Sequence, residues 1–424
     1  MSSILTNTSA MVALQTLKSI NSGLVKTQEQ ISTGKNVATA KDNAAIWAIS
    51  KVMEADMNGF KAISDSLSLG ESTVAVARQG SETVTELLST MKTKIVAAQE
   101  SNVDRAKIQT DIDALQDQIN AVVSAAQFNG LSLLSNSTAT VNSGTVNVLA
   151  SLDRSGSGVA ANQIAVGKND LTMKARAVTG GTVAVSTAAV TLNATQTATL
   201  AVNSTVTTGG RVFSIGLTGT DADSSKFVPA TYTTGATAAD AQKIMYITRD
   251  GDTAADIAKG LAQSFAIYAA KNNIDTKVVN VAASGSNLSV SSTVTDATDT
   301  VAVRIDTLTT PTSVTIGGGL EEINSFDVTT EAGAKSALVA VEYMIQTAVD
   351  AAASFGSVEG RIETQSKFIS GLTDSLKAGI GTLVDANMEE ASARLQALQV
   401  QQQLGIQSLS IANQAPQSIL SLFR

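Results

Sequence analysis

The fold is decided by residues 42–100, which read DNAAIWAISKVMEADMNGFKAISDSLSLGESTVAVARQGSETVTELLSTMKTKIVAAQE. Apolar side chains recur here at alternating spacings of three and four, so they fall on one stripe of a helix. Only Asp56, Gly70 and Ser81 interrupt the repeat. The stripe comprises Ile46, Ile49, Met53, Phe60, Ile63, Leu67, Val74, Ala77, Val84, Leu88, Met91 and Ile95. This pattern predicts one long helix that packs against other helices along a coiled-coil seam.

A second helix follows the polar segment Ser101-Asn102-Val103-Asp104, which suits a helix end and a new N-cap. Asn129-Gly130 then supplies a left-handed turn at its far end. Because the connection between the helices is short, we expect the second to fold back on the first as an antiparallel pair. Its seam repeats the same spacing through Ile108, Ile112, Leu115, Ile119, Val122 and Ala126.

Both ends of the chain also favour helices. Residues 1–33 carry a weaker apolar stripe, which Asn21 and Gln28 interrupt. Residues 334–384 keep a helical seam, and a last helix continues to Pro416, where we expect it to stop. Each terminal helix alone would be marginal in water. We therefore expect about forty residues at each end to be largely disordered until assembly, and to fold when they dock.

The middle of the chain changes character. Short β-prone runs appear between residues 179 and 315, rich in Val, Ile and Thr. One helix over residues 254–271 interrupts them, capped by Asp252-Thr253, and with the neighbouring strands it predicts a compact βαββ unit. The predicted fold is therefore mainly α: a long antiparallel coiled-coil helical bundle from both chain ends, with an inserted β-rich or α+β outer domain.

The composition excludes several classes of function. The chain has no cysteine and no histidine, which removes disulfides, thiolate metal sites and the commonest general base. A Ser-Lys hydrolytic route stays formally open. A net charge of −8 without a basic stripe argues against nucleic-acid binding, and no run approaches the length of a membrane span. The N-terminus has no charged segment followed by an apolar core, so no secretory signal is expected.

Several motifs have simpler explanations than chemistry. Gly34-Lys35 lacks the earlier glycine of a phosphate-binding loop and predicts a turn. Gly317-Gly318-Gly319 predicts a hinge between the inserted domain and the helical arm. Asp250-Gly251-Asp252 resembles the start of a calcium loop, but its later ligand positions fall inside a predicted helix. We therefore expect no catalytic residue, metal or cofactor. The alternative of an enzyme would rest on Asp250, Asp252 and Lys259.

The two ends together resemble bacterial flagellin. At the N-terminal end the resemblance rests on Ile4-Leu5-Thr6-Asn7, on Ile31-Ser32-Thr33-Gly34-Lys35 and on Ala40-Lys41-Asp42-Asn43-Ala44-Ala45. At the C-terminal end it rests on Asp385-Ala386-Asn387-Met388-Glu389-Glu390 and on Ile411-Ala412-Asn413-Gln414-Ala415-Pro416-Gln417-Ser418-Ile419-Leu420. Motifs at opposite ends, in the right order, make the resemblance specific, and it is closest to alphaproteobacterial flagellins. It covers roughly residues 1–175 and 320–424.

The resemblance implies a division into three parts. Residues 1–40 and 385–424 would form the inner tube of a filament. Residues 41–175 and 321–384 would form a coiled-coil domain with a short β-hairpin region, and residues 176–320 would be a variable domain on the filament surface. By resemblance, self-assembly would involve Ile4, Leu5, Asn7, Leu14, Leu17, Leu24, Ile31, Gly34, Asp42, Asn43, Ala44, Ala45, Met388, Ile411, Asn413, Gln414, Ile419 and Leu420.

The resemblance also implies function and partners. The chain would polymerise into the flagellar filament, outside the cell, after export through the flagellar type III channel without a cleaved signal. Partners would be further copies, sister flagellins, cap and hook-junction proteins and an export chaperone, with neither nucleic acid nor membrane. A hook–filament junction protein or a surface adhesin with the same helical ends stays an alternative.

The sequence departs from the family pattern at two places. Asp42-Asn43 and Ile46-Trp47 stand where the family block usually has two aspartates and then Gly-Leu. Residues 88–96 lack the arginine and glutamate through which some flagellins contact an animal innate receptor. We therefore expect that receptor not to be engaged.

Overall fold

The computed structural model describes residues 7–155, 158–193, 195–202, 209–220, 233–235, 237–293 and 299–422, without the side chains of 154, 155, 158, 159 and 415–422. The chain divides into two compact units. One comprises Met1–Asp65, Arg154–Val159 and Lys367–Arg424, and the other comprises Ser66–Asp153 and Ala160–Ser366. Each unit is described by itself.

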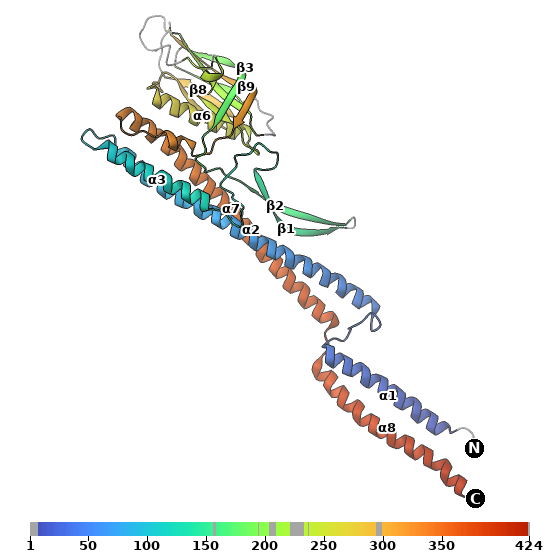
Figure 1. Ribbon diagram of the computed structural model, residues 1–424. Helices are drawn as coiled ribbons and strands as arrows, with labels where there is room; N and C mark the ends of the chain where they lie inside the picture. The colour runs from blue at the N-terminus through green and yellow to red at the C-terminus, as the bar shows by residue number, and fades with distance from the viewer. Residues whose placement is uncertain are drawn as a thin grey trace. The chain divides into compact units, whose positions relative to one another are not determined.

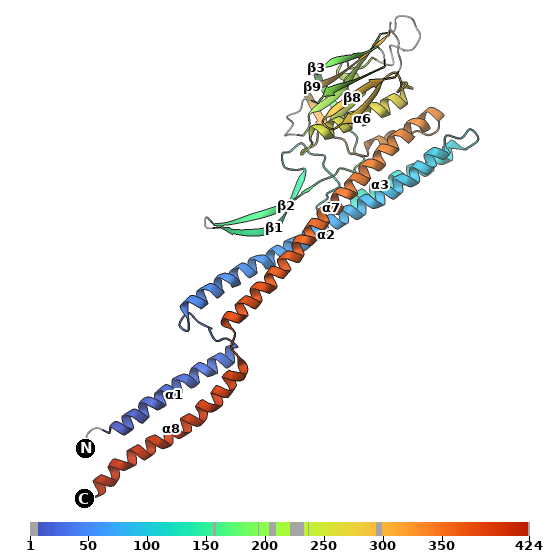
Figure 2. The same ribbon diagram turned by 180° about the vertical axis from the view of Figure 1, so that it is seen from behind.

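The first unit is built around a pair of helices from the two chain ends. Helix α1 (Thr8–Thr33) and helix α8 (Met388–Leu422) lie side by side in both views (Figures 1 and 2). Asn7 caps α1 by accepting a hydrogen bond from the Ala10 N–H. Gly34 ends α1 in the left-handed conformation, with φ of 69°, which agrees with the turn expected at Gly34-Lys35.

The second unit contains a three-helix bundle made by α3 (Arg105–Ala125) and parts of α2 (Ala44–Ala97) and α7 (Glu331–Val384) (Figure 1). The predicted α2 seam is confirmed within it, since Leu67, Val74 and Leu88 are at most 1% exposed. Ion pairs tie the helices together at their edges: Arg78 Nε lies 2.6 Å from a Glu359 oxygen, and Lys94 Nζ lies 2.6 Å from Asp111. The predicted antiparallel pair of α2 and α3 is also confirmed.

Short elements connect this bundle to the inserted domain. Strands β1 (Thr145–Ser155) and β2 (Gly158–Gly167) form a two-stranded sheet. A short 3₁₀ helix, η1 (Glu321–Ser325), precedes α7. The two chain crossings into the inserted domain are hydrogen-bonded to each other, because the Gly318 N–H donates to the Lys174 carbonyl and the Leu320 N–H to the Thr172 carbonyl.

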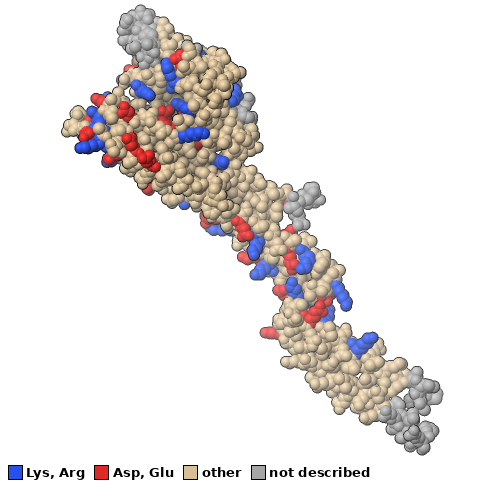
Figure 3. Space-filling model, in the orientation of Figure 1, with Lys and Arg blue, Asp and Glu red and all other residues tan. Residues whose placement is uncertain are grey.

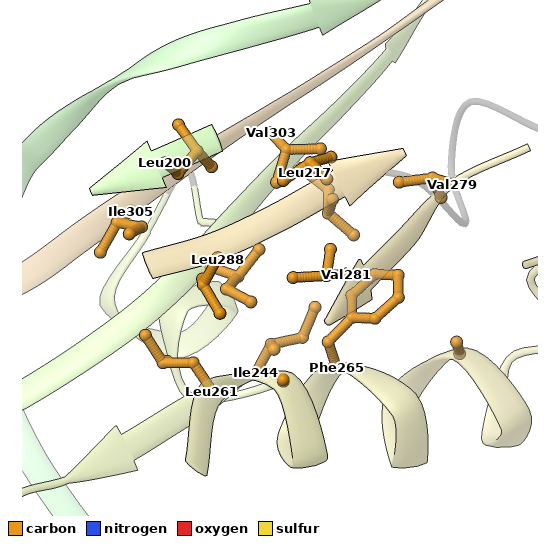
Figure 4. Close-up of a cluster of buried hydrophobic side chains, with 14 of the residues drawn as sticks. Leu200, Leu217, Ile244, Leu261, Phe265, Val279, Val281, Leu288, Val303 and Ile305 are labelled. Carbon is orange, nitrogen blue, oxygen red and sulfur yellow. The ribbon is translucent and has the colours of Figure 1, made fainter. Parts of the chain in front are cut away.

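The inserted domain has two antiparallel sheets and one long helix. The four-stranded sheet has the order β3 (Ala177–Leu192), β9 (Thr300–Thr315), β5 (Val212–Thr220), β6 (Met245–Ile247). The three-stranded sheet has the order β4 (Gln196–Ala201), β8 (Asn287–Ser292), β7 (Asn280–Ser284). Helix α6 (Ala254–Lys271) packs Leu261 and Phe265 into the core that the sheets share (Figure 4). A single turn, α5 (Ala238–Ala241), lies before β6.

Helix α6 has the bounds that the sequence predicts, and a Thr253–Asp256 capping box fixes its start. The expected single βαββ unit is wrong, however. Strand β6 pairs with β5 in the four-stranded sheet, whereas β7 and β8 belong to the other sheet. Sequence neighbours were assigned to one sheet, but the partner of β6 comes from a strand earlier in the chain.

Two further expectations are corrected. Helix α8 does not stop at Pro416 but continues to Leu422. The run Gly317-Gly318-Gly319 is not a loose hinge, because a Cβ on Gly318 would lie 1.8 Å from the Thr172 carbonyl oxygen and one on Gly319 would lie 2.2 Å from that of Asp170. These glycines permit a close backbone crossing.

Candidate functional site

The inner contact between α1 and α8 is a seam of partly buried side chains. The inward positions on α1 follow the three–four spacing of a coiled coil, and inward residues of α8 pack against them. The two helices run antiparallel and approach closely at glycines: a Cβ on Gly405 would lie 3.2 Å from Leu17, and one on Gly23 would lie 3.6 Å from Leu398. The seam comprises Ala10, Ala13, Leu17, Ile20, Leu24, Thr27 and Ile31 with Ala391, Leu395, Leu398, Gln402, Gly405, Leu409 and Ala412.

Two amide side chains cross this seam. The Asn7 Nδ2 donates to the Ala412 carbonyl at 2.9 Å, and the Gln402 Nε2 donates to Asn21 Oδ1 at 2.7 Å. Amides form hydrogen bonds without carrying charge, so they fix a pairing at a low desolvation cost. The polar interruptions of the apolar stripe therefore join the two ends of the chain.

The outer face of the α1–α8 pair is apolar and almost uncharged. Sequence positions 395–423 contain no charged residue. Figure 3 shows this part of the surface as mostly uncharged. A groove of about 690 Å³ between the helices is lined by uncharged residues that include Val12, Ile20 and Leu404. Large apolar side chains that are more than two-fifths exposed on this pair are Met11, Val12, Leu14, Val25, Met388, Val400, Leu404, Ile406 and Ile411.

A second contact joins the loops at which the two helical arms turn. The Ala386 N–H donates to the Gly34 carbonyl at 2.9 Å, and the Asn36 N–H donates to the Val384 carbonyl at 2.7 Å. Val37, Ile380 and Val384 form a small buried core beneath these bonds. Ile46 and Trp47, which differ from the usual family residues, pack against this core and so contribute to the same junction.

Side-chain caps and ion pairs complete the junction. Asn43 Oδ1 accepts from the Ile46 N–H at the start of α2, and Asn387 Oδ1 accepts from the Glu390 N–H at the start of α8. The Thr39 N–H and hydroxyl both donate to Asp42 and hold the pKa of its carboxyl below its ordinary value.

Glu54 on α2 is held in its charged form. Its hydrogen bond from Lys51, 2.7 Å away, lowers the pKa of its carboxyl, and Lys35 at 3.7 Å adds to the effect.

The structure separates the predicted assembly residues into several groups. Leu17, Leu24 and Ile31 line the seam, whereas Leu14, Met388 and Ile411 point outward. Asn7, Gly34 and Asn43 end or begin helices, Asp42 holds the turn before α2, and Ala44 and Ala45 lie exposed in the first turn of α2. Asn413 and Gln414 are exposed on α8. Ile4 and Leu5 lie outside the described residues, and Ile419 and Leu420 lie in α8 without described side chains.

Sequence reasoning missed several residues of this surface. Met11, Val12, Leu404 and Ile406 are among its most exposed apolar side chains. The signal that could have found them is the long run without charge at positions 395–423. A helix that keeps apolar residues on every side and no charge is typical of one that is covered on every side.

The residues considered for catalysis have structural roles. The Tyr246 hydroxyl and the Arg249 N–H donate to Asp252, the Gly144 N–H donates to Asp250, and Lys259 pairs with Asp350. Across the described ranges, no three acidic side chains are placed to hold a metal ion. Among the helices that the structure describes, none is long and apolar enough to cross a membrane.

Two family models match the helical ends of the chain. The sequence model of the bacterial flagellin N-terminal helical region matches residues 4–139, and that of the bacterial flagellin C-terminal helical region matches residues 338–423. Flagellin A of Rhizobium meliloti is 36% identical over 441 residues, which cover 100% of both chains. Flagellin FljM of Caulobacter vibrioides is 29% identical, covering 100% of this chain and 99% of that one.

Solved structures are more distant. FliC from Burkholderia pseudomallei is 15% identical with a TM-score of 0.31, covering 69% of this chain and 99% of its own. The flagellar junction protein FlgL from Legionella pneumophila is 12% identical with a TM-score of 0.30, covering 74% of this chain and 99% of its own.

Proposed function

Because the chain belongs to the bacterial flagellin family, and is thus a structural subunit of the extracellular flagellar filament, we propose that its α1–α8 pair forms the inner tube of that filament. The exposed apolar side chains of the pair would then contact neighbouring copies. Flagellins are structural proteins of motility rather than enzymes. Full-length similarity to flagellins favours a filament subunit over a junction protein or an adhesin.

One observation carries the proposal: the α1–α8 pair exposes large apolar side chains on a surface with few charges. Val12 is 63% exposed, Leu404 is 59% exposed and Ile411 is 63% exposed. Each would contribute roughly 1.5–3 kcal/mol if a second copy buried it fully. A surface of this kind is typical of a protein interface rather than of a face that stays in water.

The experiment is seeded polymerisation, read by electron microscopy and by the lowest protein concentration that sustains filaments. Val12→Ser should raise this concentration at least tenfold, because a buried contact between copies is lost. Val185→Ser is the matched control, since Val185 on β3 is 62% exposed but lies in the inserted domain. Equal effects of the two substitutions would contradict an interface on the α1–α8 pair.

The remaining parts of the chain follow from this placement. Residues 1–40 and 385–424 would line the inner tube, residues 41–175 and 321–384 would form the coiled-coil shell, and residues 176–320 would project outward. The assembly residues would be those proposed by resemblance, joined by Met11, Val12, Leu404 and Ile406. One feature of the charge distribution supports this division, because positions 395–423 contain no charged residue.

Export and partners belong to the same proposal. The chain would leave the cell through the flagellar type III channel without a cleaved signal, bound beforehand by a chaperone that covers its apolar ends. Cap and hook-junction proteins, and sister flagellins, would meet the same α1–α8 surface. Deleting the type III export gate should keep the protein inside the cell, as immunoblots of culture medium would show.

The animal innate flagellin receptor would not be engaged. Within residues 88–96, Leu88, Met91 and Ile95 are buried in the bundle and only Ser, Thr, Lys and Val side chains remain accessible. No arginine or glutamate stands there to form charged hydrogen bonds with a receptor. A receptor reporter assay with purified monomer should give no signal, and a strong signal would contradict this expectation.

A further inference from the structure

Pro416 lies inside helix α8, where proline is normally excluded. Proline has no backbone N–H, so it cannot donate to the carbonyl four residues earlier in the helix. That carbonyl belongs to Ala412. Ala412 therefore keeps a carbonyl oxygen that the helix itself does not satisfy.

The unsatisfied carbonyl is the one that Asn7 binds. Asn7 Nδ2 donates to the Ala412 oxygen at 2.9 Å, although the two residues are 405 positions apart in the chain. The same side chain caps α1, because its Oδ1 accepts from the Ala10 N–H at 3.0 Å. One amide therefore begins α1 and completes α8.

Only an amide can form both bonds in this geometry. Serine and aspartate also cap helices, but aspartate has no donor when ionised. A serine hydroxyl can both accept and donate, but it is one oxygen on a side chain one bond shorter, so it does not span the two partners that the Asn7 Oδ1 and Nδ2 reach separately. A polar group left without a partner on docking costs free energy comparable to a lost hydrogen bond. The pairing of Asn7 with Pro416 thus explains why a proline is tolerated in this helix.

The same chemistry selects one register between the helices. A slip of one turn would place Asn7 beside Ser408 instead of Ala412. The Ser408 carbonyl already has its helical donor, the Ala412 N–H, in an unbroken helix. Ala412 offers the oxygen without such a donor, so the correct register is the one that satisfies both ends.

We propose that Asn7, Ala412 and Pro416 form a register lock, through which the C-terminal helix both positions the start of α1 and stabilises it. The lock couples the two chain ends, since the Asn7 Nδ2 and the Ala412 carbonyl lose each other as partners when the helices are apart. The lock rests on the proposed function, since both readouts are made on filaments. The hydrogen bond between Gln402 and Asn21 differs, because it joins two side chains and gives no backbone group a partner.

The test is a double-mutant cycle in the full-length chain. Asn7→Ser keeps a capping oxygen but shortens the side chain, so that it no longer reaches the Ala412 carbonyl, and it should raise the lowest concentration that sustains filaments about five- to tenfold, as expected for one lost hydrogen bond. Pro416→Ala returns an N–H to the Ala412 carbonyl. In that background, Asn7→Ser should raise the concentration less than about twofold, because the carbonyl keeps a partner.

The control is Asn21→Ser, which should have the same effect with Pro416 as with alanine there. The lock is overturned if Asn7→Ser is harmless beside Pro416, or equally harmful in both backgrounds. Failure of the unmodified chain to form filaments would instead contradict the proposed function.

A second measurement reports the register between α1 and α8 directly, as the distance between two spin labels. The natural chain has no cysteine, so cysteines introduced at Ala13 and Ser408 are the only residues that react with a thiol-specific spin label. Both positions line the groove between α1 and α8. In filaments diluted with unlabelled protein, the natural sequence should give one narrow distance distribution, and Asn7→Ser should add a second population. A single unchanged distribution in Asn7→Ser would overturn the register role.

Discussion

The α1–α8 pair and the α2–α3–α7 bundle are both built from amphipathic helices, but they differ in how completely they bury their apolar side chains. In the bundle, three helices enclose a seam, and Val84, Leu88 and Met91 are all 0% exposed. In the pair, each helix covers only one side of the other, so Leu14 stays 57% exposed and Leu404 59% exposed. A third helix covers apolar positions that lie beside the seam, whereas in a pair those positions stay exposed. The bundle thus buries its own seam, whereas the pair leaves apolar side chains that we propose further copies cover.

Proteolysis gives the largest test of this difference. Limited digestion of dilute monomer should remove about 40 residues from each end and leave a resistant core, because the α1–α8 pair buries little when no neighbour covers it. Mass spectrometry would locate the cuts, and the trimmed protein should form no filament. Intact ends under conditions that cut an unfolded control would show that the pair is stable alone.

Substitution inside the bundle should have the next largest effect. Leu88→Ala removes a fully buried side chain and should lower the free energy of unfolding of the monomer by about 2–5 kcal/mol. Leu14→Ala, on the exposed face of α1, should change it by less than about 0.5 kcal/mol. Urea denaturation measures both values. Comparable losses would mean that α1 is packed in the monomer as tightly as α2.

The close crossing at the base of the inserted domain should rank third. Gly318→Ala would place a Cβ 1.8 Å from the Thr172 carbonyl, so the backbone must move, at a cost of roughly 1–3 kcal/mol. Gly360→Ala in α7 is the matched control, since nothing lies within 4 Å of its added Cβ. That control should be neutral or stabilise the helix by up to about 1 kcal/mol. Hydrogen exchange of residues 170–176 would reveal the local opening.

The smallest effect is a pH dependence of opposite sign in the two units. The pKa of Glu54 is lowered, so its contribution to stability is present above the ordinary value of 4.5 and is lost as pH falls through the folded pKa. Asp306 in β9 is fully buried, and burial raises the pKa of its carboxyl. Its contribution is fully present below 3.8 and is lost as pH rises through the raised pKa.

Two neutral variants separate these contributions. Glu54→Gln should destabilise the protein at neutral pH by well under about 1 kcal/mol and have no effect in acid. Asp306→Asn should become relatively more stabilising as pH rises from 3.8. Unfolding curves between pH 3 and 8, about the range in which carboxylates titrate, would measure both. Parallel slopes for the two variants would contradict the opposite pKa shifts.

Local patterns predicted the elements that are stabilised by sequence neighbours. The seven-residue repeat of α2 and the Thr253 cap of α6 are confirmed by the buried Leu88 and by the capping box. Pro416 was misjudged, because the compensating donor Asn7 lies at the other end of the chain. The sheet partner of β6 was missed for the same reason, since strand pairing is non-local.

The assembly surface shows the same division. Its uncharged composition is written in positions 395–423, and motifs at both ends identify the family. The sequence does not show which side chains face inward. Leu14 and Leu17 are both leucines of the same apolar stripe, yet Leu17 packs beside Gly405 and Leu14 stays exposed.

The sequence by itself determined where helices form, that positions 395–423 carry no charge and that the family is flagellin, because periodicity, capping and composition act over a few residues. Only the tertiary structure decided the antiparallel register of α1 on α8, the exposure of Leu14, the close crossing at Gly318 and the use of the Ala412 carbonyl. Each of these depends on groups brought together from distant positions. Their free energies arise from packing and hydrogen bonding that exist only once the chain has folded.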